Sequence, residues 1–209
     1  MTSELPNAPA AERNKVPIYE ALAQSIPDKG TLLEIASGYG QHTVYFAERT
    51  PSWTFIPSDV SRENVVVIAA RLSASGLNNV RPPQILDVRE AAWNVPTLDA
   101  VLNVNMIHIS PWSAAEGLFR GAARALNDSG LLMTYGPYRI GGEHTAPSNA
   151  EFDTRLRAMD PRFGVRDLES VEALAQKHGF TRIDIRPMPA NNFFVCFRRI
   201  RSREPGTEA

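Results

Sequence analysis

The sequence predicts one α/β domain with a mostly parallel β-sheet and helices on both faces. Three observations support this prediction: the length of the chain, the alternation of strand-like with helix-like segments, and two final strands that lie too close in sequence to be parallel. The chain has 209 residues, which suits one compact domain. Its hydrophobic content of 43% is sufficient for a buried core and argues against global disorder.

Short apolar runs alternate with helix-like segments through most of the chain. The expected strands are 31–36, 53–56 (closed by 57–59), 84–87, 99–105 and 131–135. Helices are expected over 41–49, after an N-cap at Ser61, after a capping box at Ser113 and Glu116 that ends before Gly130, and over 168–179. Strands that alternate with helices in this way indicate a parallel sheet covered on both faces.

The last two expected strands decide the type of sheet. Residues 181–186 alternate between polar and apolar side chains, whereas 192–197 are almost continuously apolar. Only residues 187–191 lie between them, and a parallel crossover needs about a dozen residues or more, so the pair should be antiparallel. A parallel sheet that ends in an interior antiparallel strand is typical of the Rossmann-like class I methyltransferase fold, with seven strands in all.

The two ends of the chain lack this organisation. Residues 1–11 are small, polar and rich in proline, and residues 200–209 lack apolar periodicity. We expect a flexible arm over 1–11, a methyltransferase domain over 12–199 and a flexible tail over 200–209.

Composition narrows the class of partner and the compartment. The 22 basic and 23 acidic residues leave a formal net charge of −1, so nucleic acid is not an expected partner. No apolar stretch approaches the roughly 20 residues that span a bilayer, and no signal segment opens the sequence, so we expect a cytoplasmic protein without a membrane partner. The four histidines and Cys196 have no metal-ligand spacing, so no metal site is expected.

Candidate cofactor residues fall at the carboxyl ends of the expected strands, where open α/β sheets bind ligands. Gly38 and Gly40 follow the first strand and allow the backbone to approach a cofactor. Glu34, within that strand, is placed to reach the ammonium of a methionine portion directly or through water. Asp59 ends the second strand and would accept ribose hydroxyls, and Asp87 ends the third and would accept the adenine amino group. This order of groups predicts S-adenosyl-L-methionine as the cofactor.

Each of these signals also has a plain structural interpretation. A Gly-x-Gly sequence is often only a tight turn, and an aspartate after a strand is often a helix cap or a turn residue. A nicotinamide dinucleotide site would require a third glycine, but Thr43 stands at that position. It is the occurrence of all these groups in one order that favours a methyltransferase.

Several unusual strings suggest a specific family. They are AERN at 11–14, LEIASGYGQH at 33–42, PSD at 57–59, NMIHISPW at 105–112, YGP at 135–137, SNAEFD at 148–153 and MPANN at 188–192. With these strings the chain resembles the methyltransferase-like protein 26 family over roughly residues 11–200. The family has long been described as a domain of unknown function and is regarded as S-adenosylmethionine-dependent.

The chain departs from the usual pattern at two positions of the loop. Ala36 stands where class I enzymes usually have glycine, and Tyr39 stands where a small residue is expected. Tyr39 either stacks beside the cofactor or points to solvent. Arg13 and Asn14 either fold over the cofactor carboxylate or belong to a solvated N-terminal segment.

The sequence defines the residues around the methyl acceptor less clearly than those around the cofactor. Asn105 and His108 follow the fourth expected strand, normally beside the transferable methyl group. His108 is a candidate general base, and the alternative is a structural histidine at the rim of the site. Residues 136–150 are expected to form a long loop, either a lid over the substrate or a variable surface loop. The predicted function is methyl transfer to an unidentified small molecule or protein; the alternative is a catalytically silent cofactor-binding domain that acts through a protein partner.

Overall fold

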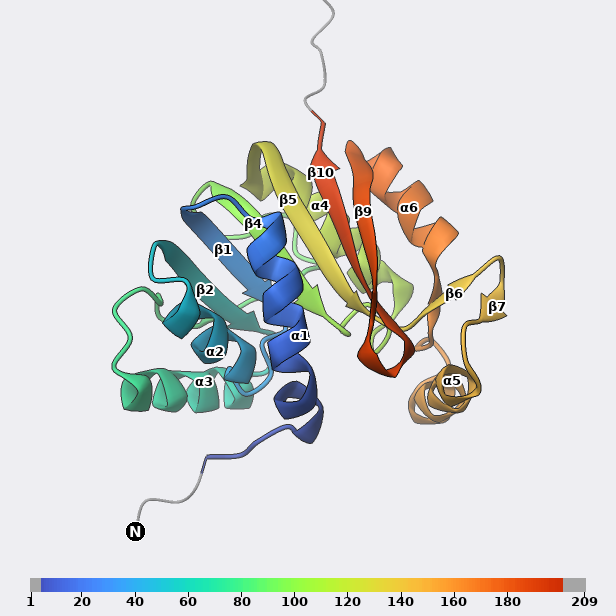
Figure 1. Ribbon diagram of the computed structural model, residues 1–209, viewed down its shortest axis with the longest axis horizontal. Helices are drawn as coiled ribbons and strands as arrows, with labels where there is room; N and C mark the ends of the chain where they lie inside the picture. The colour runs from blue at the N-terminus through green and yellow to red at the C-terminus, as the bar shows by residue number, and fades with distance from the viewer. Residues whose placement is uncertain (1–4, 201–209) are drawn as a thin grey trace, which may run out of the picture.

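The computed structural model describes residues 5–200, and its main sheet has seven strands in the order β3-β2-β1-β4-β5-β10-β9 (Figure 1). These strands are β1 (Gly30–Ile35), β2 (Trp53–Asp59), β3 (Gln84–Ile85), β4 (Leu98–Val104), β5 (Leu126–Gly136), β9 (Phe180–Met188) and β10 (Asn192–Arg199). β10 pairs antiparallel with both β5 and β9, and the other pairs of neighbours are parallel. The predicted seven-stranded fold with an antiparallel last strand is confirmed.

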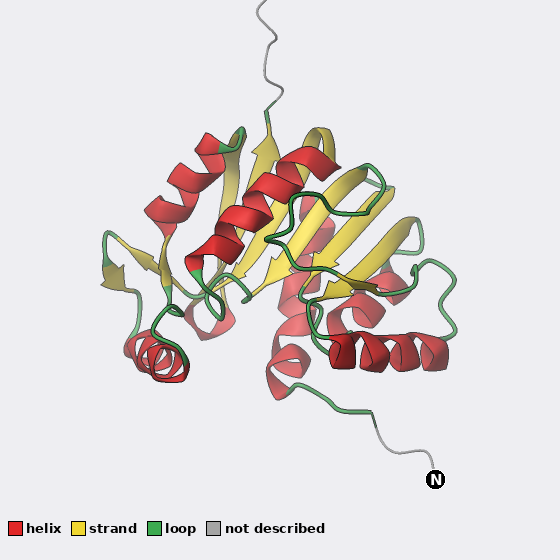
Figure 2. Cartoon of the chain, turned by 180° about the vertical axis from the view of Figure 1, so that it is seen from behind, coloured by secondary structure: helices red, strands yellow, loops and turns green. Residues whose placement is uncertain are grey.

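Helices cover both faces of this sheet (Figures 1 and 2). They are α1 (Pro9–Ser25), α2 (Gln41–Arg49), α3 (Arg62–Ser75), α4 (Trp112–Ala125), α5 (Pro147–Met159) and α6 (Leu168–Lys177). Side chains of α1 and α2 pack with Leu32 in one apolar core, and those of α4 and α6 pack with Leu33 in the other. Since successive side chains of a strand point to opposite faces, β1 is buried on both sides, as its continuous apolar run predicts.

The predicted N-terminal arm is wrong at its inner end, because α1 begins at Pro9. Proline is favoured in the first turn of a helix, where its missing N–H leaves no hydrogen bond unmade. Residues 1–4 of the predicted arm, and residues 201–209 of the predicted tail, lie outside the described residues. Ile200 donates its backbone N–H to the carbonyl of Gly179 at 2.7 Å and so closes the last strand onto the end of α6.

Three other predicted boundaries differ from the structure. β2 continues through Pro57 to Asp59; proline is tolerated there because the outer neighbour β3 pairs only with the last two residues of β2. The capping box after residue 113 does not form, since α4 begins at Trp112 after Pro111. Gly130 lies inside β5 and is not the C′ residue of a helix. The N-cap at Ser61 is confirmed: its side chain accepts the N–H of Asn64 at 3.2 Å.

The segment predicted as a long loop is largely ordered structure. β6 (Tyr138–Ile140) and β7 (Glu143–His144) form a hairpin, and β8 (Arg166–Asp167) completes a second, three-stranded sheet. α5 follows this hairpin and lies near the turn between β9 and β10 (Figure 1). Within residues 5–200, no helix is both long and apolar enough to cross a membrane.

Candidate functional site

The loop between β1 and α2 makes a sharp turn at the carboxyl end of the sheet. Ala36, Gly38 and Gly40 have φ angles of 58°, 59° and 77°, in the left-handed region that favours glycine. No atom lies within 4 Å of the position that a Cβ on Gly38 would take, so the space beside this residue is open. Ala36 therefore carries the strain of this turn with its Cβ in place, whereas Gly38 leaves room for a ligand.

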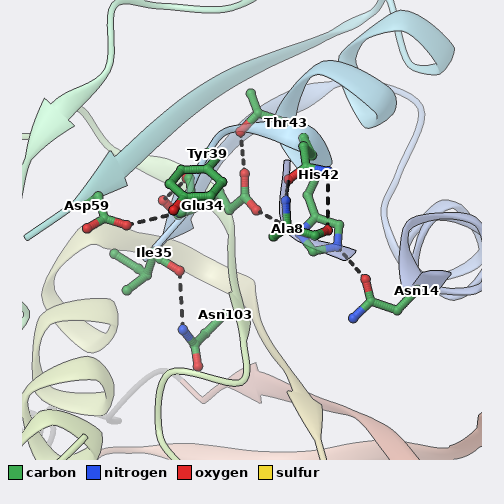
Figure 3. Close-up of polar contacts among 12 residues, drawn as sticks. Ala8, Asn14, Glu34, Ile35, Tyr39, His42, Thr43, Asp59 and Asn103 are labelled. Carbon is green, nitrogen blue, oxygen red and sulfur yellow. Dashed lines mark hydrogen bonds and ion pairs between the residues drawn. The ribbon is translucent and has the colours of Figure 1, made fainter. Parts of the chain in front are cut away.

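Asp59 holds this loop to the end of β2. One carboxylate oxygen accepts the N–H of Gly38 and the other accepts the N–H of Ser61, both at 2.9 Å (Figure 3). The carboxylate is almost fully buried. Hydrogen bonds from backbone N–H groups to a charged acceptor are among the stronger ones in proteins. Asp59 is thus a structural support of the loop, in addition to its predicted role toward a ribose.

Glu34 is buried at the end of β1 and its carboxylate turns into the domain (Figure 3). The hydroxyl of Thr43 donates to it, and Nδ1 of His42 lies 3.7 Å from its Oε1. Burial raises the pKa of Glu34 to about 7, although hydrogen bonds from Thr43 and Ser37 oppose the rise. The side chain lines neither of the cavities defined below. The contact with a methionine ammonium, direct or through water, stays a prediction.

A chain of polar contacts runs from Glu34 to the end of β5. Nε2 of His42 lies 2.7 Å from Oδ1 of Asn14 (Figure 3), and the side chain of Asn14 also hydrogen-bonds the hydroxyl of Tyr135. Burial lowers the pKa of His42 to about 4, so this imidazole is neutral at neutral pH. Because the oxygen of Asn14 must accept, the neutral His42 carries its proton on Nε2, and the amide nitrogen of Asn14 is left to face Tyr135.

The segment that precedes α1 is tied across this loop. Arg71 of α3 donates through Nε to the carbonyl of Tyr39 at 2.7 Å, and through Nη2 to the carbonyl of Pro6 at 2.6 Å. Gln41 accepts the N–H of Ala8 at 2.7 Å. We call residues 6–8 the N-terminal strap. The side chain of Tyr39 is half-buried and lines neither of the two cavities, so it remains a predicted contact of the cofactor only.

An apolar cavity of about 410 Å³, cavity A, lies beyond the ends of β1 and β4. Its lining comes from Ile35 and Ala36, Val60, residues 86–89, Val104, Met106, residues 109–111, Ala114 and Phe163. Asp87 is the acidic residue of this cavity within the described chain. An apolar cavity with one carboxylate would suit a purine ring with an exocyclic amino group.

The position of Asp87 relative to its strand differs from the predicted one. β3 ends at Ile85, so Asp87 lies two residues beyond the strand. Both of its carboxylate oxygens accept hydrogen bonds from Nε of Arg89, at 2.9 and 3.1 Å, and the hydrogen bonds from Arg89 lower the pKa of Asp87. A carboxylate keeps further lone pairs after this pairing, so Asp87 retains acceptor capacity on the side that faces cavity A.

A second cavity of about 450 Å³, cavity B, lies on the other side of the residues that follow β4. Its lining comes from α1 (Ala10, Arg13, Asn14, Pro17), Asn105, the end of β5 (Tyr135, Pro137), α5 (Ser148, Asn149, Phe152, Arg155) and the β9–β10 turn (Pro189, Ala190, Asn192). Val104 and Met106 line cavity A, whereas Asn105 between them lines cavity B. Asn105 has a φ of 63°, a conformation that asparagine adopts more readily than most residues. Residues 104–106 therefore form part of the wall of both cavities.

His108 lines neither cavity, and its role as general base stays a prediction. The side chain is fully buried, with Nδ1 3.3 Å from the N–H of Arg166 and its ring against that of Tyr138 at 4.9 Å. Burial, reinforced by the charge of Arg166, lowers the pKa of His108 to about 3. This imidazole lines no cavity, and its buried Nε2 has no hydrogen-bond partner among the described residues; its burial favours the structural alternative.

The predicted site residues thus fall into three groups. Arg13, Asn14 and Asn105 come together around cavity B, and Asp87 lines cavity A. Glu34, Gly38, Gly40 and Asp59 build the loop that separates β1 from α2. Sequence reasoning missed Tyr135, Asn149 and the whole contribution of α5. The two strings YGP and SNAEFD were the available signals, but nothing in either string shows that residues of β5 and α5 face one cavity.

Solved structures of methyltransferases share this fold. An O-methyltransferase family protein from Burkholderia thailandensis superposes with a TM-score of 0.77 at 15% sequence identity, over 91% of this chain and 57% of that one. The mitomycin 7-O-methyltransferase MmcR gives a TM-score of 0.77 at 17% identity, over 91% and 55%. The SAH-bound form of CalO1, a methyltransferase in calicheamicin biosynthesis, gives 0.75 at 14% identity, over 91% and 54%. The chain spans little more than half the length of these proteins, and the likeness is one of fold.

A family model covers nearly the whole of the described chain. The model of a protein of unknown function, DUF938, matches residues 5–199. The match includes α1, the loop between β1 and α2, both cavities and the antiparallel hairpin of β9 and β10. The chain belongs to the DUF938 family.

Proposed function

We propose that this protein is an S-adenosylmethionine-dependent methyltransferase. The observation that carries the proposal is that residues 104–106, beyond the carboxyl ends of the parallel strands, line both cavity A and cavity B. Cavity A has an apolar lining and a carboxylate for an adenine, and cavity B would be the chamber for an acceptor. The solved structures with this fold include a protein named as an S-adenosylmethionine-dependent methyltransferase, which supports the same conclusion.

The residues present fit the cofactor. Cavity A would hold the adenine, with Asp87 as acceptor for its amino group, and Asp59 would accept the ribose hydroxyls. The open space beside Gly38 would take the methionine portion as it passes toward Asn105. Arg13 and Asn14 on α1 would meet its carboxylate at the near end of cavity B. When bound, the cofactor supplies an electrophilic methyl group on a positively charged sulfur.

What the chain itself contributes is alignment. Asn105 lines cavity B, between two residues that line cavity A, and within residues 5–200 its side chain makes no hydrogen bond, so it is free to contact a ligand. Methyl transfer is an in-line displacement, so holding the donor and the acceptor in the two cavities that share residues 104–106 would align them for the reaction. We further propose membership of the methyltransferase-like protein 26 family and a cytoplasmic location, on the sequence strings and composition given above.

The first experiment is isothermal titration of the full chain with S-adenosylmethionine and with S-adenosylhomocysteine. We expect both to bind, and no binding at millimolar cofactor would refute the proposal. Two glycines of α4 provide a matched pair of variants. A Cβ on Gly117 would lie 2.4 Å from the backbone oxygen of Val88 in the wall of cavity A, whereas one on Gly121 would meet the ring of Trp93 outside it. Gly117→Ala should weaken cofactor binding, and folded Gly121→Ala should retain it.

Formation of S-adenosylhomocysteine separates an enzyme from a silent cofactor-binding domain. The chain is incubated with S-adenosylmethionine and fractionated cell metabolites, and the fractions that yield S-adenosylhomocysteine are analysed for a mass increase of one methyl group. Turnover establishes the enzyme. Cofactor binding without turnover in any fraction, small-molecule or protein, supports the alternative.

A further inference from the structure

Cavity B combines unpaired positive charge with an absence of groups that take up a proton. Among the described residues that line it, Arg13 and Arg155 are charged, and none is aspartate, glutamate, histidine, lysine or cysteine. Within residues 5–200 the guanidinium of Arg13 has no hydrogen-bond or ion-pair partner. Arg155 has an exposed contact with Glu151 at 3.9 Å, and such exposed pairs contribute little; its guanidinium also lies 5.9 Å from the ring centroid of Phe152. The guanidinium of Arg13 is the group proposed above for the carboxylate of the cofactor, and that of Arg155 is available to an acceptor.

Two polar groups of the cavity, Asn14 and Tyr135, are oriented as hydrogen-bond donors. Asn14 turns its oxygen to His42 (Figure 3), so its amide nitrogen faces the hydroxyl of Tyr135. Burial raises the pKa of Tyr135, so this hydroxyl keeps its proton and can donate it toward the cavity. An environment of guanidinium, amide N–H and hydroxyl groups stabilises an anion and disfavours a cation.

Neither buried histidine near the cavity supplies a base. His42 lies behind Asn14 and is neutral, with its Nε2–H committed to the oxygen of that residue. His108 is fully buried beneath Gly136 and does not line the cavity. An aliphatic alcohol or a protonated amine must lose a proton to act as a nucleophile, and the described walls of cavity B offer nothing to receive it.

We infer that cavity B takes a small organic anion as the methyl acceptor, with its nucleophilic atom already deprotonated at neutral pH. This inference rests on the proposed function. A carboxylate is the commonest such group, and an acidic thiol or phenol shares the same chemistry. Phe152, Pro137 and Pro17 provide apolar walls for the rest of such a molecule.

The transfer then needs no proton movement. An electron pair on the anionic oxygen of the acceptor forms the new bond to the methyl carbon, as the bond from that carbon to sulfur breaks and its electron pair stays on sulfur. The acceptor loses one negative charge and the sulfur loses its positive charge, so the products are a neutral methyl ester and S-adenosylhomocysteine. A thiolate or phenolate would give a thioether or an aryl ether by the same step.

The test compares matched compounds that differ only in this group. Benzoate, benzamide and benzyl alcohol, and then hexanoate, hexanamide and hexanol, are titrated by NMR into the full chain saturated with S-adenosylhomocysteine. We expect the acid of at least one set to bind about tenfold more tightly than its amide or alcohol. The affinities of thiophenol and 4-nitrophenol are compared with that of anisole in the same way, to test a thiolate and a phenolate as the anion.

Two variants of α5 test the role of Arg155: one removes its charge, and the other is the control. Arg155→Gln should reduce the affinity for the acid by about five- to tenfold and leave the amide unchanged. Glu151→Gln, one turn away and exposed to a similar degree, should not reduce binding of the acid. With S-adenosylmethionine in place of the product, mass spectrometry should find the methylated anion.

Two results would overturn the inference. If no anion binds better than its neutral partner, including the case in which none of them binds, the inference is wrong. Equal binding of the acid by the wild type and Arg155→Gln would also overturn it. Cofactor titration of the same samples keeps the two proposals apart: loss of cofactor binding refutes the proposed function, whereas cofactor binding without a preference for anions refutes only the acceptor class.

Discussion

Replacement of Glu34 by glutamine should change how the stability of the domain depends on pH. The Glu34 carboxyl is 2% exposed, and its pKa is raised from 4.5 to about 7 by burial. Between these two pH values the native state binds a proton that the unfolded chain has lost, so the free energy of unfolding falls as pH rises. Glutamine has the same shape and keeps an oxygen that can accept from Thr43, but it does not ionise.

The size of the effect follows from the pKa change. At about 1.4 kcal/mol for each pH unit, a rise from 4.5 to about 7 corresponds to about 3 kcal/mol of stability lost between pH 4.5 and pH 7. His42 acts in the opposite sense: its pKa is lowered from 6.5 to about 4, so its contribution to stability increases as pH rises through that range. In the wild type these two changes in the free energy of unfolding with pH oppose each other, and Glu34→Gln removes the one that belongs to Glu34.

The assay is urea denaturation of both proteins at pH 5, 6, 7 and 8. The difference between the two free energies of unfolding isolates Glu34, because the contributions of His42 and His108 are common to both proteins. We expect Glu34→Gln to match the wild type near pH 5 and to exceed it by about 3 kcal/mol at pH 8. A difference that stays constant from pH 5 to pH 8 would refute the assignment of a raised pKa to Glu34.

Three further substitutions test the loop and its surroundings. Asp59→Ala should cost about 2–4 kcal/mol in urea denaturation, because two buried N–H groups lose a charged acceptor, and should weaken cofactor binding at least tenfold in isothermal titration; unchanged affinity would show that the ribose lies elsewhere. Gly136→Ala should cost about 1–3 kcal/mol, measured in the same way, since its Cβ would lie 2.5 Å from Nε2 of His108; a neutral effect would mean that the imidazole is free to move. Arg71→Ala should raise the rate of amide hydrogen exchange in Asn7, Ala8 and Tyr39, and unaltered exchange would contradict the importance of this arginine.

Much of the fold could be predicted because its signals are local. The antiparallel pairing of the last two strands followed from the five residues between them, which are too few for a parallel crossover. The N-cap at Ser61 followed from a side chain and its own helix. The pairing of Asp87 with Arg89 was equally local, two residues apart, and could have been inferred from the sequence.

The parts that could not be predicted depend on contacts between distant segments. α5 gave no apolar periodicity because two of its three buried residues, Asn149 and Asp153, are polar. Each is buried because it hydrogen-bonds a remote backbone: Asn149 donates to the carbonyl of Asn191 at 2.9 Å, and Asp153 accepts the N–H of Val165 at 2.7 Å. His108 is another such case, because it is covered by residues more than fifty positions later in the chain.

The N-terminal strap links the stability of residues 6–8 to that of the loop between β1 and α2. Arg71 holds Pro6 and Tyr39 at the same time, and Gln41 holds Ala8 at the start of the helix that forms one wall of cavity B. Ordering of the first described residues and ordering of the loop between β1 and α2 are therefore parts of one cooperative unit. A ligand that orders the loop should therefore also slow proteolysis at residues 6–8, and loss of the contacts of Arg71 with the strap should weaken binding at the site.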